Sequence, residues 1–393
     1  MKKSKVKSLF FYIFLFSLLI SCGSSKQIFE FGSVKTLNSI ENIKINYNYD
    51  LPLCKVFIGG KQYVFLVDTG APTVIPTEIF SRLKLPSYFE EEVTDTNNKK
   101  NKQIFTILPS IKIGNLTFEK IGCVVMDIKT SELKCYGFDG IIGANLLAKM
   151  AWQFDYTKQE IRATSNFENF KQDYDFVISF QYNNQKTPKI NGKILDKNLV
   201  FTLDTGYSGN LSINNDSKYY SSNIDKNNFI KIKGINAIGL YGYDELKDNF
   251  ILKSDIEFGE SIIAQEIIKS GNSNLIGNEF LKHYLFSIDW KNKKIYLKNI
   301  NKQKEPIKSF GFTYIFKDNN AIVISKFENK NIPIQLNDRI LKINNTDFTK
   351  LPTEKICEYS TNKIEDNLNQ IEITVERNNK ILSYKLTKEE FLK

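Results

Sequence analysis

Two Asp-Thr-Gly tripeptides are the residues of this chain best suited to chemistry. One begins at Asp68 and the other at Asp204, and each follows a short run, 65–67 or 201–203, that is mostly apolar. Two carboxyl groups that share one site cannot both ionise cheaply, so one pKa rises and the pair holds a single proton. One member can then take a proton from water while the other donates one. The two tripeptides therefore indicate acid–base chemistry, provided that the fold brings them together.

The surroundings of the two tripeptides repeat as well. Residues 65–70 correspond to 201–206 at an offset of 136 positions. An apolar-apolar-Gly segment follows each tripeptide, and the segments at 140–143 and 274–277 are related by an offset of 134. A lone Asp-Thr-Gly is also typical of an Asp-capped turn between strands. Two copies in register instead indicate one structural unit present twice.

Strands are expected to predominate in both units. Residues 55–67, 104–113 and 200–203 are β-branched or aromatic runs interrupted by Gly, Asn and Pro. Helical patterns are scarce, and the clearest ones lie at 144–151 and 279–284, just after each apolar-apolar-Gly segment. The fold class expected is mainly β.

From about residue 51 to 299, these motifs resemble the pepsin and retropepsin family of aspartic peptidases. The resemblance implies two pseudo-twofold-related β lobes, placed here at residues 46–165 and 166–302. It also implies hydrolysis of a peptide or protein substrate by water activated between Asp68 and Asp204, without cofactor or metal. The alternative is a catalytically inactive relative that binds peptides at the cell envelope.

The resemblance assigns supporting roles to further residues. Two threonines would hydrogen-bond across the pseudo-twofold axis, two glycines would turn the loops tightly, and two later glycines would let a strand pack beneath each loop. These are Thr69 and Thr205, Gly70 and Gly206, and Gly143 and Gly277. The residues after each tripeptide, 71–73 and 207–209, depart from the usual pattern of the family, more so in the second lobe.

In these families a glycine-bearing hairpin, the flap, closes over the substrate. The stretch 231–243 suits that role in the second lobe, with Gly239, Tyr241 and Gly242 as substrate-facing residues. The corresponding stretch of the first lobe, 90–105, has no glycine, so we expect its flap to be short, mobile or absent.

The last ninety residues or so, 305–393, resemble a small α+β PDZ domain. Residues 309–312 are similar to its carboxylate-binding loop, and 334–344 to a later conserved segment of that fold; a helix at 353–359 and strands at 371–375 and 382–386 complete the expected order. Phe310, Gly311 and Phe312 would hold the carboxylate of a peptide C-terminus. Ser309 replaces the usual first glycine, and a domain used only for packing against the lobes remains the alternative.

The first 45 residues predict export and anchoring. Four lysines precede an apolar run at 9–20, which as a helix spans about 18 Å, too short for a bilayer core of about 30 Å. We expect a signal peptide at 1–21 and a tether at 22–45. Residues 19–22 resemble a bacterial lipobox, so Cys22 is the expected lipidation site; an ordinary signal peptide is the alternative. The expected location is the bacterial envelope, on the periplasmic or outer-membrane face.

Composition excludes several other classes. The chain of 393 residues has a formal charge of +10, which falls to +6 without the four leader lysines and is too dispersed to predict nucleic-acid binding. Its one histidine, His283, argues against a Ser-His-Asp hydrolase or a zinc site and is expected to be a packing or surface residue. Four cysteines remain besides Cys22, and either a Cys123–Cys135 bridge or buried free thiols are compatible with an oxidising compartment. These cysteines are Cys54, Cys123, Cys135 and Cys357.

Overall fold

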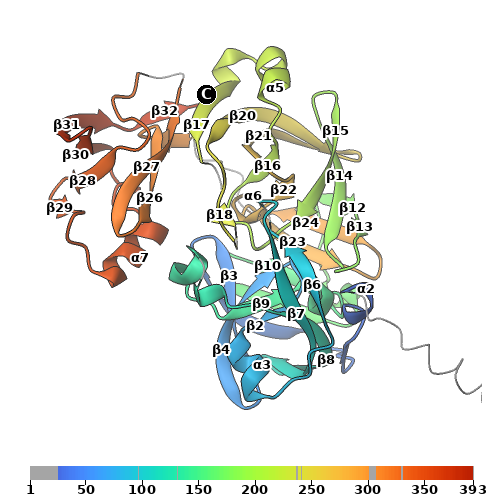
Figure 1. Ribbon diagram of the computed structural model, residues 1–393. Coiled ribbons are helices and arrows are strands. Elements are labelled where there is room, and N and C mark those ends of the chain that lie inside the picture. The colour runs from blue at the N-terminus through green and yellow to red at the C-terminus, as the bar shows by residue number, and fades with distance from the viewer. Residues whose placement is uncertain are drawn as a thin grey trace, which may run out of the picture.

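The computed structural model describes residues 25–95, 97–130, 132–235, 238–239, 241–300, 307–328 and 331–392. The predicted signal peptide and Cys22 lie outside these residues. Within the described part, no helix is long and apolar enough to cross a membrane. The protein is mainly β, as the sequence predicts, and Figure 1 shows two lobes with a third unit beside the second lobe.

The first lobe is built on the strand that ends at Asp68. This strand, β4 (Lys61–Asp68), forms a hairpin with β3 (Leu51–Ile58) and runs parallel to β9 (Gly140–Gly143). The strands β5 (Val74–Ile75), β8 (Leu116–Val125), β7 (Lys100–Ile113) and β6 (Phe89–Thr94) extend the sheet in that order. Alternate side chains of β3 and β4 are buried in a large apolar core, so hydrophobic patterning determines which face each residue occupies.

The second lobe repeats this arrangement. Strand β15 (Lys197–Leu203) forms a hairpin with β14 (Pro188–Ile194) and runs parallel to β22 (Leu275–Ile276). The strands β16 (Leu211–Asn214), β21 (Ser261–Gly271), β20 (Lys247–Phe258) and β17 (Phe229–Gly234) follow, and the short β13 (Gln181–Tyr182) pairs with β14. The helices α3 (Thr77–Arg82) and α5 (Ser217–Asn223) lie at comparable points of the two lobes, after β5 and β16.

A run of six strands joins the lobes. It contains β12 (Phe176–Ser179), β24 (Lys294–Asn299), β23 (Tyr284–Asp289), β10 (Ala151–Asp155), β11 (Glu160–Thr164) and β2 (Glu41–Asn48), in this order. The central pair is β10 with β23, one from each repeat, and Phe154 stacks on Phe286 with ring centroids 4.4 Å apart. Because both repeats contribute to this shared sheet, neither lobe packs independently of the other.

The two helices predicted after the apolar-apolar-Gly segments are shorter than expected. One turn, α4 (Ala144–Leu147), follows Gly143, and one turn, α6 (Asn278–Leu281), follows Gly277. Short turns follow both helices, and the last residue of each predicted helix, Ala151 or Tyr284, already begins β10 or β23 of the shared sheet. His283 lies just after α6.

Much of the segment predicted as a tether packs against the first lobe. The helix α2 (Ser25–Ile28) is followed by β1 (Ser33–Val34), which pairs with β8, and residues 41–48 form β2. Ile28 and Phe29 are buried in an apolar cluster that includes Phe105. Residues 25–45 are therefore part of the folded unit, because their apolar side chains are buried on folding.

The C-terminal domain, residues 307–392, is attached to the second lobe by strand pairing. It contains β26 (Phe312–Lys317), β27 (Asn320–Phe327), β28 (Arg339–Ile343), β29 (Thr346–Asp347), α7 (Thr353–Thr361), β30 (Gln370–Arg377), β31 (Lys380–Thr387), and the pair β25 (Ile307–Ser309) and β32 (Glu389–Phe391). The helix and the last two long strands lie where the sequence predicts them. Strand β27 pairs with β17, so the sheet of the second lobe continues into this domain.

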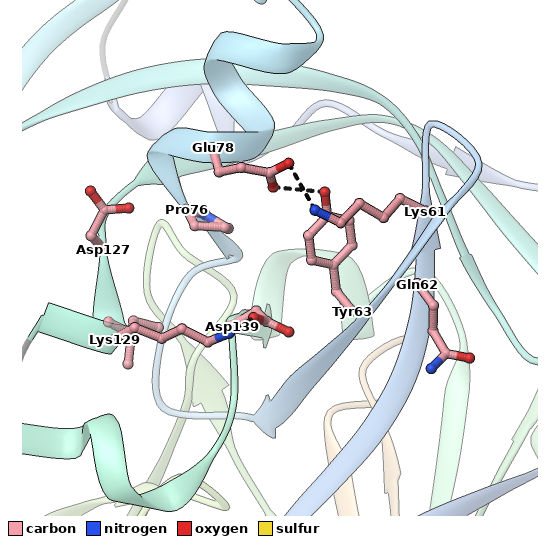
Figure 2. A pocket seen from close by; sticks show the side chains of 9 residues that line it. Lys61, Gln62, Tyr63, Pro76, Glu78, Asp127, Lys129 and Asp139 are labelled. Carbon is pink, nitrogen blue, oxygen red and sulfur yellow. Dashed lines mark hydrogen bonds and ion pairs between the residues drawn. The ribbon is translucent and has the colours of Figure 1, made fainter.

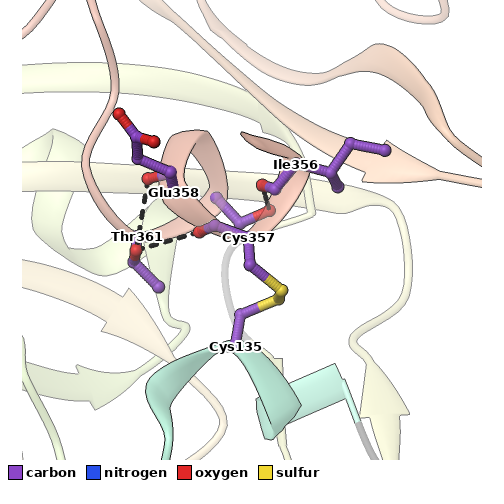
Figure 3. The surroundings of a disulfide bond; sticks show 6 residues. Cys135, Ile356, Cys357, Glu358 and Thr361 are labelled. Carbon is purple, nitrogen blue, oxygen red and sulfur yellow. Dashed lines mark hydrogen bonds between the residues drawn. A yellow bond between two sulfur atoms is a disulfide. The ribbon is translucent and has the colours of Figure 1, made fainter. Parts of the chain in front are cut away.

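A disulfide forms a second attachment of the C-terminal domain. Cys135 lies in η2 (Glu132–Tyr136) of the first lobe, beside η1 (Ile128–Thr130), and is bonded to Cys357 of α7 (Figure 3). The Cys123–Cys135 pairing, one of the two alternatives left open by the sequence, is therefore wrong. Cys123 is free and buried within β8, as Cys54 is within β3, while Cys135 faces an element 222 residues later in the chain.

Candidate active site

The two aspartates meet between the lobes. Asp68 is the last residue of β4 and Asp204 directly follows β15, so each parallel strand pair delivers one carboxyl group to the centre. A Cβ atom on Gly70 would lie 2.6 Å from Cγ of Asp204, and one on Gly206 would lie 2.3 Å from Oδ2 of Asp68. Each carboxyl group is thus seated against the glycine of the opposite loop, where a side chain could not be accommodated.

Burial and mutual interaction govern the titration of this dyad. Both aspartates are only 8% exposed. Burial raises the pKa of Asp68, although the backbone N–H of Gly70 and a hydrogen bond with Asp204 act in the opposite direction. Burial also raises the pKa of Asp204 well above its usual value, and the neighbouring Asp68 charge adds to this rise. The two carboxyl groups therefore titrate as a coupled pair that favours sharing one proton.

Backbone amides orient the carboxylates. The N–H of Gly70 donates to Oδ1 of Asp68 at 2.7 Å, and the N–H of Gly206 donates to Oδ1 of Asp204 at 3.0 Å. Because each bond joins a residue to the one two positions later, the loop fixes its own carboxylate.

A reciprocal threonine pair, Thr69 and Thr205, connects the loops beneath the dyad. The hydroxyl of Thr69 donates to the carbonyl of Leu203 at 2.7 Å and accepts from the N–H of Thr205 at 3.1 Å. The hydroxyl of Thr205 donates to the carbonyl of Val67 at 2.7 Å and accepts from the N–H of Thr69 at 3.0 Å. Both side chains are fully buried. Four hydrogen bonds across the axis hold the aspartates in a common geometry.

Gly143 and Gly277 lie close against the two loops. A Cβ on Gly143 would lie 2.1 Å from the backbone of Pro72, and one on Gly277 would lie 2.2 Å from the carbonyl oxygen of Gly209. Only glycine permits these approaches. The ring of Tyr207, which departs from the family pattern, packs against Gly209 and Gly277 and fills the second loop.

Two buried asparagines support the loops and were missed from the sequence. Oδ1 of Asn145 accepts from both the N–H and the hydroxyl of Thr73, at 2.8 and 2.9 Å. Nδ2 of Asn278 donates to the carbonyl of Thr205 at 2.7 Å, and its Oδ1 accepts from Tyr156 at 2.7 Å. The sequence signal for these two residues is an Asn shortly after the glycine of each apolar-apolar-Gly segment: Asn145 follows Gly143 by two positions and Asn278 follows Gly277 by one.

The first lobe has a well-formed hairpin, contrary to the sequence-based expectation. Strands β6 and β7 pair from Phe89–Phe105 to Thr94–Lys100. The turn is made without glycine, because Oδ1 of Asp95 accepts from the N–H groups of Asn97 and Lys99, and Asn98 adopts the left-handed conformation. Asparagine and aspartate thus replace the missing glycine.

The tip of this hairpin contacts the predicted flap of the second lobe. Gly239 in β18 (Ile238–Gly239) pairs with Gly242 in β19 (Gly242–Tyr243). The backbone N–H of Tyr241 donates to Oδ2 of Asp95 at 2.9 Å, and its hydroxyl accepts from Nε2 of Gln103 at 3.2 Å. Further contacts join Asn97 to the carbonyl of Gly242 and Lys99 to the carbonyl of Tyr243. The two hairpins therefore meet tip to tip.

A cavity of about 450 Å³ lies elsewhere on the first lobe (Figure 2). It is lined by Lys61 and Tyr63 at the start of β4, whereas Asp68 ends that strand, about 17 Å beyond Tyr63. Glu78 accepts hydrogen bonds from both Tyr63 and Lys61, at 2.7 and 3.1 Å. Lys129 likewise pairs with Asp139 at 2.5 Å. Most of the charged groups that line this cavity are therefore already paired, and the dyad remains the candidate site.

In the C-terminal domain, residues 310–311 connect β25 to β26, and Phe312 is the first residue of β26. Gly311 has a φ of +78°, and its N–H donates to the hydroxyl of Ser309 at 2.9 Å. Phe310 is buried in the core of the domain, and the carbonyl of Gly311 accepts from the N–H of Phe327 at 2.8 Å. Over all described residues, no group of three or more His, Cys, Asp or Glu side chains is placed to hold a metal ion.

Comparison with known proteins supports an aspartyl-protease type of lobe. A family model described as "Aspartyl protease" matches residues 54–146, which include Asp68, Gly70 and Gly143. No curated protein matches the chain. Among solved structures, an aspartic proteinase from Irpex lacteus is similar at 14% identity and a TM-score of 0.40, covering 66% of this chain and 97% of its own. The family match and the site geometry define an aspartic-peptidase-like arrangement, which the second lobe completes.

Proposed function

We propose that the chain is an aspartic endopeptidase whose catalytic residues are Asp68 and Asp204. The observation that carries this proposal is the placement of two buried carboxyl groups, each against the glycine of the other loop. A carboxyl pair that shares one proton supplies a base and an acid in the same place. Peptide hydrolysis requires both of these functions and no cofactor.

The mechanism follows from this pair. A water molecule between the carboxyl groups loses a proton to the ionised member and attacks the carbonyl carbon of the peptide bond. The protonated member donates a hydrogen bond to the carbonyl oxygen, and a proton then passes to the leaving nitrogen. The hairpins carrying Asp95 and Tyr241 must separate for a polypeptide to enter, because their tips are bonded to each other.

Site-directed variants test the activity. The purified full chain is incubated with a peptide library from pH 3 to 8, and cleavage is measured by mass spectrometry. Asp68→Asn and Asp204→Asn should each lower the cleavage rate by at least about a thousandfold, whereas Asp196→Asn should not, because Asp196 is exposed in the turn of the β14–β15 hairpin. A statine-type transition-state mimic should inhibit the wild type. Equal cleavage by all three variants would exclude the dyad.

The rival function is an anchored binding protein without turnover. It predicts that the wild type binds peptides but cleaves none of them at any pH tested. The closed contact between the hairpins suits either function, so turnover decides between them.

For the C-terminal domain we propose a PDZ-like role in binding a peptide C-terminus. The left-handed Gly311, the preceding Ser309 and the position of β26 between this turn and β27 support the proposal. The N–H of Gly311 is already bonded to Ser309, so a bound carboxylate would have to displace that hydroxyl. Fluorescent peptides with a free or an amidated C-terminus provide the test. Binding of the free form alone supports the role, and binding of neither supports packing only.

Anchoring through a lipid on Cys22 is likewise proposed. A folded segment begins by Ser25, so an acyl chain on Cys22 would hold the first lobe close to a membrane surface. Expression of the full chain and of Cys22→Ser in a bacterium, followed by membrane fractionation, tests this proposal. Equal membrane association of both forms would contradict it.

A further inference from the structure

The β-hairpins that deliver the two aspartates differ in chemistry at a facing pair of residues close to the dyad. Lys189 and Thr202 occupy the positions that Leu53 and Leu66 occupy in the first lobe, at the same offset of 136 that relates Asp204 to Asp68. The registers agree, since Lys189 lies opposite Thr202 and Leu53 opposite Leu66. An apolar pair in one lobe is therefore a polar, cationic pair in the other.

These positions lie on the same face of the sheet as the catalytic carboxyl groups. Side chains alternate along a strand, so Thr202 shares its face with Asp204, about 7 Å away along the chain. Directly opposed residues of an antiparallel pair also share a face, which places Lys189 beside Thr202. The intervening residue, Leu203, points into the opposite, apolar core.

The side chain of Lys189 is half-buried near the dyad. Burial lowers the pKa of Lys189, while the negative charge of Asp204 acts in the opposite direction, which shows that the two groups lie within electrostatic reach. Its Nζ donates a hydrogen bond to the hydroxyl of Thr202 at 2.6 Å. A partly desolvated ammonium bound to a neutral hydroxyl is a favourable place for a carboxylate ligand.

The corresponding face of the first lobe is filled with apolar side chains. Leu53 and Leu66 are buried in a cluster with Phe105 and Phe138, against which Tyr241 of the second-lobe flap packs. The described side chains of this cluster are all uncharged. The difference between the two faces is therefore suited to distinguishing the side chains on either side of a scissile bond.

We propose that Lys189, with Thr202, forms a subsite that selects an Asp or Glu side chain on the second-lobe side of the scissile bond. The inference rests on the proposed peptidase function. It names Lys189 as a specificity-determining residue and acidic peptides as the substrate class. The ammonium would bind the substrate carboxylate and be released from its bond with Thr202.

The test compares matched peptides that differ only in Glu against Gln next to the cleaved bond, with Glu placed on either side in turn. For the wild type we expect a Glu/Gln ratio of kcat/KM of about ten at one of these positions. Lys189→Met should bring the ratio to about one, Lys189→Arg should retain the preference, and Lys189→Glu should favour a Lys-containing peptide. The ratio is internal to each variant, so partial misfolding does not affect it.

Lys193→Met is the matched control. Lys193 lies four residues farther along the same face of β14 and pairs with Glu257 at 3.6 Å, so its removal changes the net charge equally without touching the subsite. It should leave the wild-type ratio unchanged. An unchanged ratio in Lys189→Met would overturn the inference. A second outcome would also overturn it: in Lys189→Met, kcat falls equally for every peptide and the pH profile of cleavage shifts. That outcome means that Lys189 acts only on the titration of the dyad.

The failure of the two proposals can be distinguished. If the wild type cleaves no peptide, the proposed function fails. If the wild type cleaves peptides through Asp68 and Asp204 but shows no acidic preference that depends on Lys189, only the subsite fails.

Discussion

Replacing Thr205 by Val tests whether the threonine pair holds the lobes together. Valine has nearly the same shape but no hydroxyl, so the carbonyl of Val67 and the N–H of Thr69 lose their partner. Both groups are buried, and each unsatisfied buried group costs about 1–3 kcal/mol, so we expect the free energy of unfolding to fall by about 2–5 kcal/mol. Because Thr69 is bonded to Thr205 itself, Thr69→Val combined with Thr205→Val should cost less than the sum of the two single variants.

The assay is urea unfolding followed by tryptophan fluorescence. Trp152 is suitable because it is fully buried in β10 of the shared sheet. The control is Thr106→Val, which removes a buried hydroxyl bonded only to the carbonyl of Pro86, within the first lobe. Thr205→Ser, which retains the hydroxyl, should be close to wild type. If Thr205→Val costs no more than Thr106→Val, the cross-lobe bonds do not stabilise the dyad as argued.

Three further predictions concern titration, covalent linkage and the hairpin tips. Folding raises the pKa of Asp204 above that of the unfolded residue, which is about 3.9. Above about pH 3.9 the folded protein therefore binds more protons than the unfolded chain does, so its stability falls as the pH rises. Asp204→Asn should therefore gain stability relative to wild type between pH 4 and pH 7, and an equal difference at both pH values would contradict this. The Cys135–Cys357 bond closes a separation of 222 residues, so reduction should lower the free energy of unfolding by about 5 kcal/mol in the chain-entropy model, and non-reducing peptide mapping should recover the linked pair. Asp95→Ala removes the acceptor of the Tyr241 amide, whose hydrogen exchange should accelerate while amides of the shared sheet keep their rates.

The regularities of the repeat could be read from the sequence because they arise from local rules. Strand alternation places Asp68 and its counterpart at the ends of apolar strands, and the requirement for glycine where backbones approach closely is also local. At the same offset of 136, upstream of the tripeptides, Lys189 is equivalent to Leu53, so this difference between the lobes is also present in the sequence.

The hairpin at 89–105 shows where such local rules fail. Glycine is the usual signal for a tight turn, yet the side chain of Asp95 accepts two backbone N–H groups and Asn98 takes the left-handed conformation. A polar, glycine-free segment therefore forms a well-paired hairpin. Its tip also contacts the opposite lobe through the backbone N–H of Tyr241, and no local pattern contains such a contact.

The sequence by itself determined that the protein is mainly β, that it contains one unit twice, and that two carboxyl groups occupy equivalent positions. These properties follow from periodicity and from backbone conformations that few residues can adopt. Only the tertiary structure decided that the carboxyl groups meet, that Cys135 pairs with Cys357 rather than Cys123, and that a lysine flanks one side of the dyad. The aspartate pair and the disulfide join residues more than a hundred positions apart, and their partners are selected by the packing of whole sheets, which local sequence does not encode.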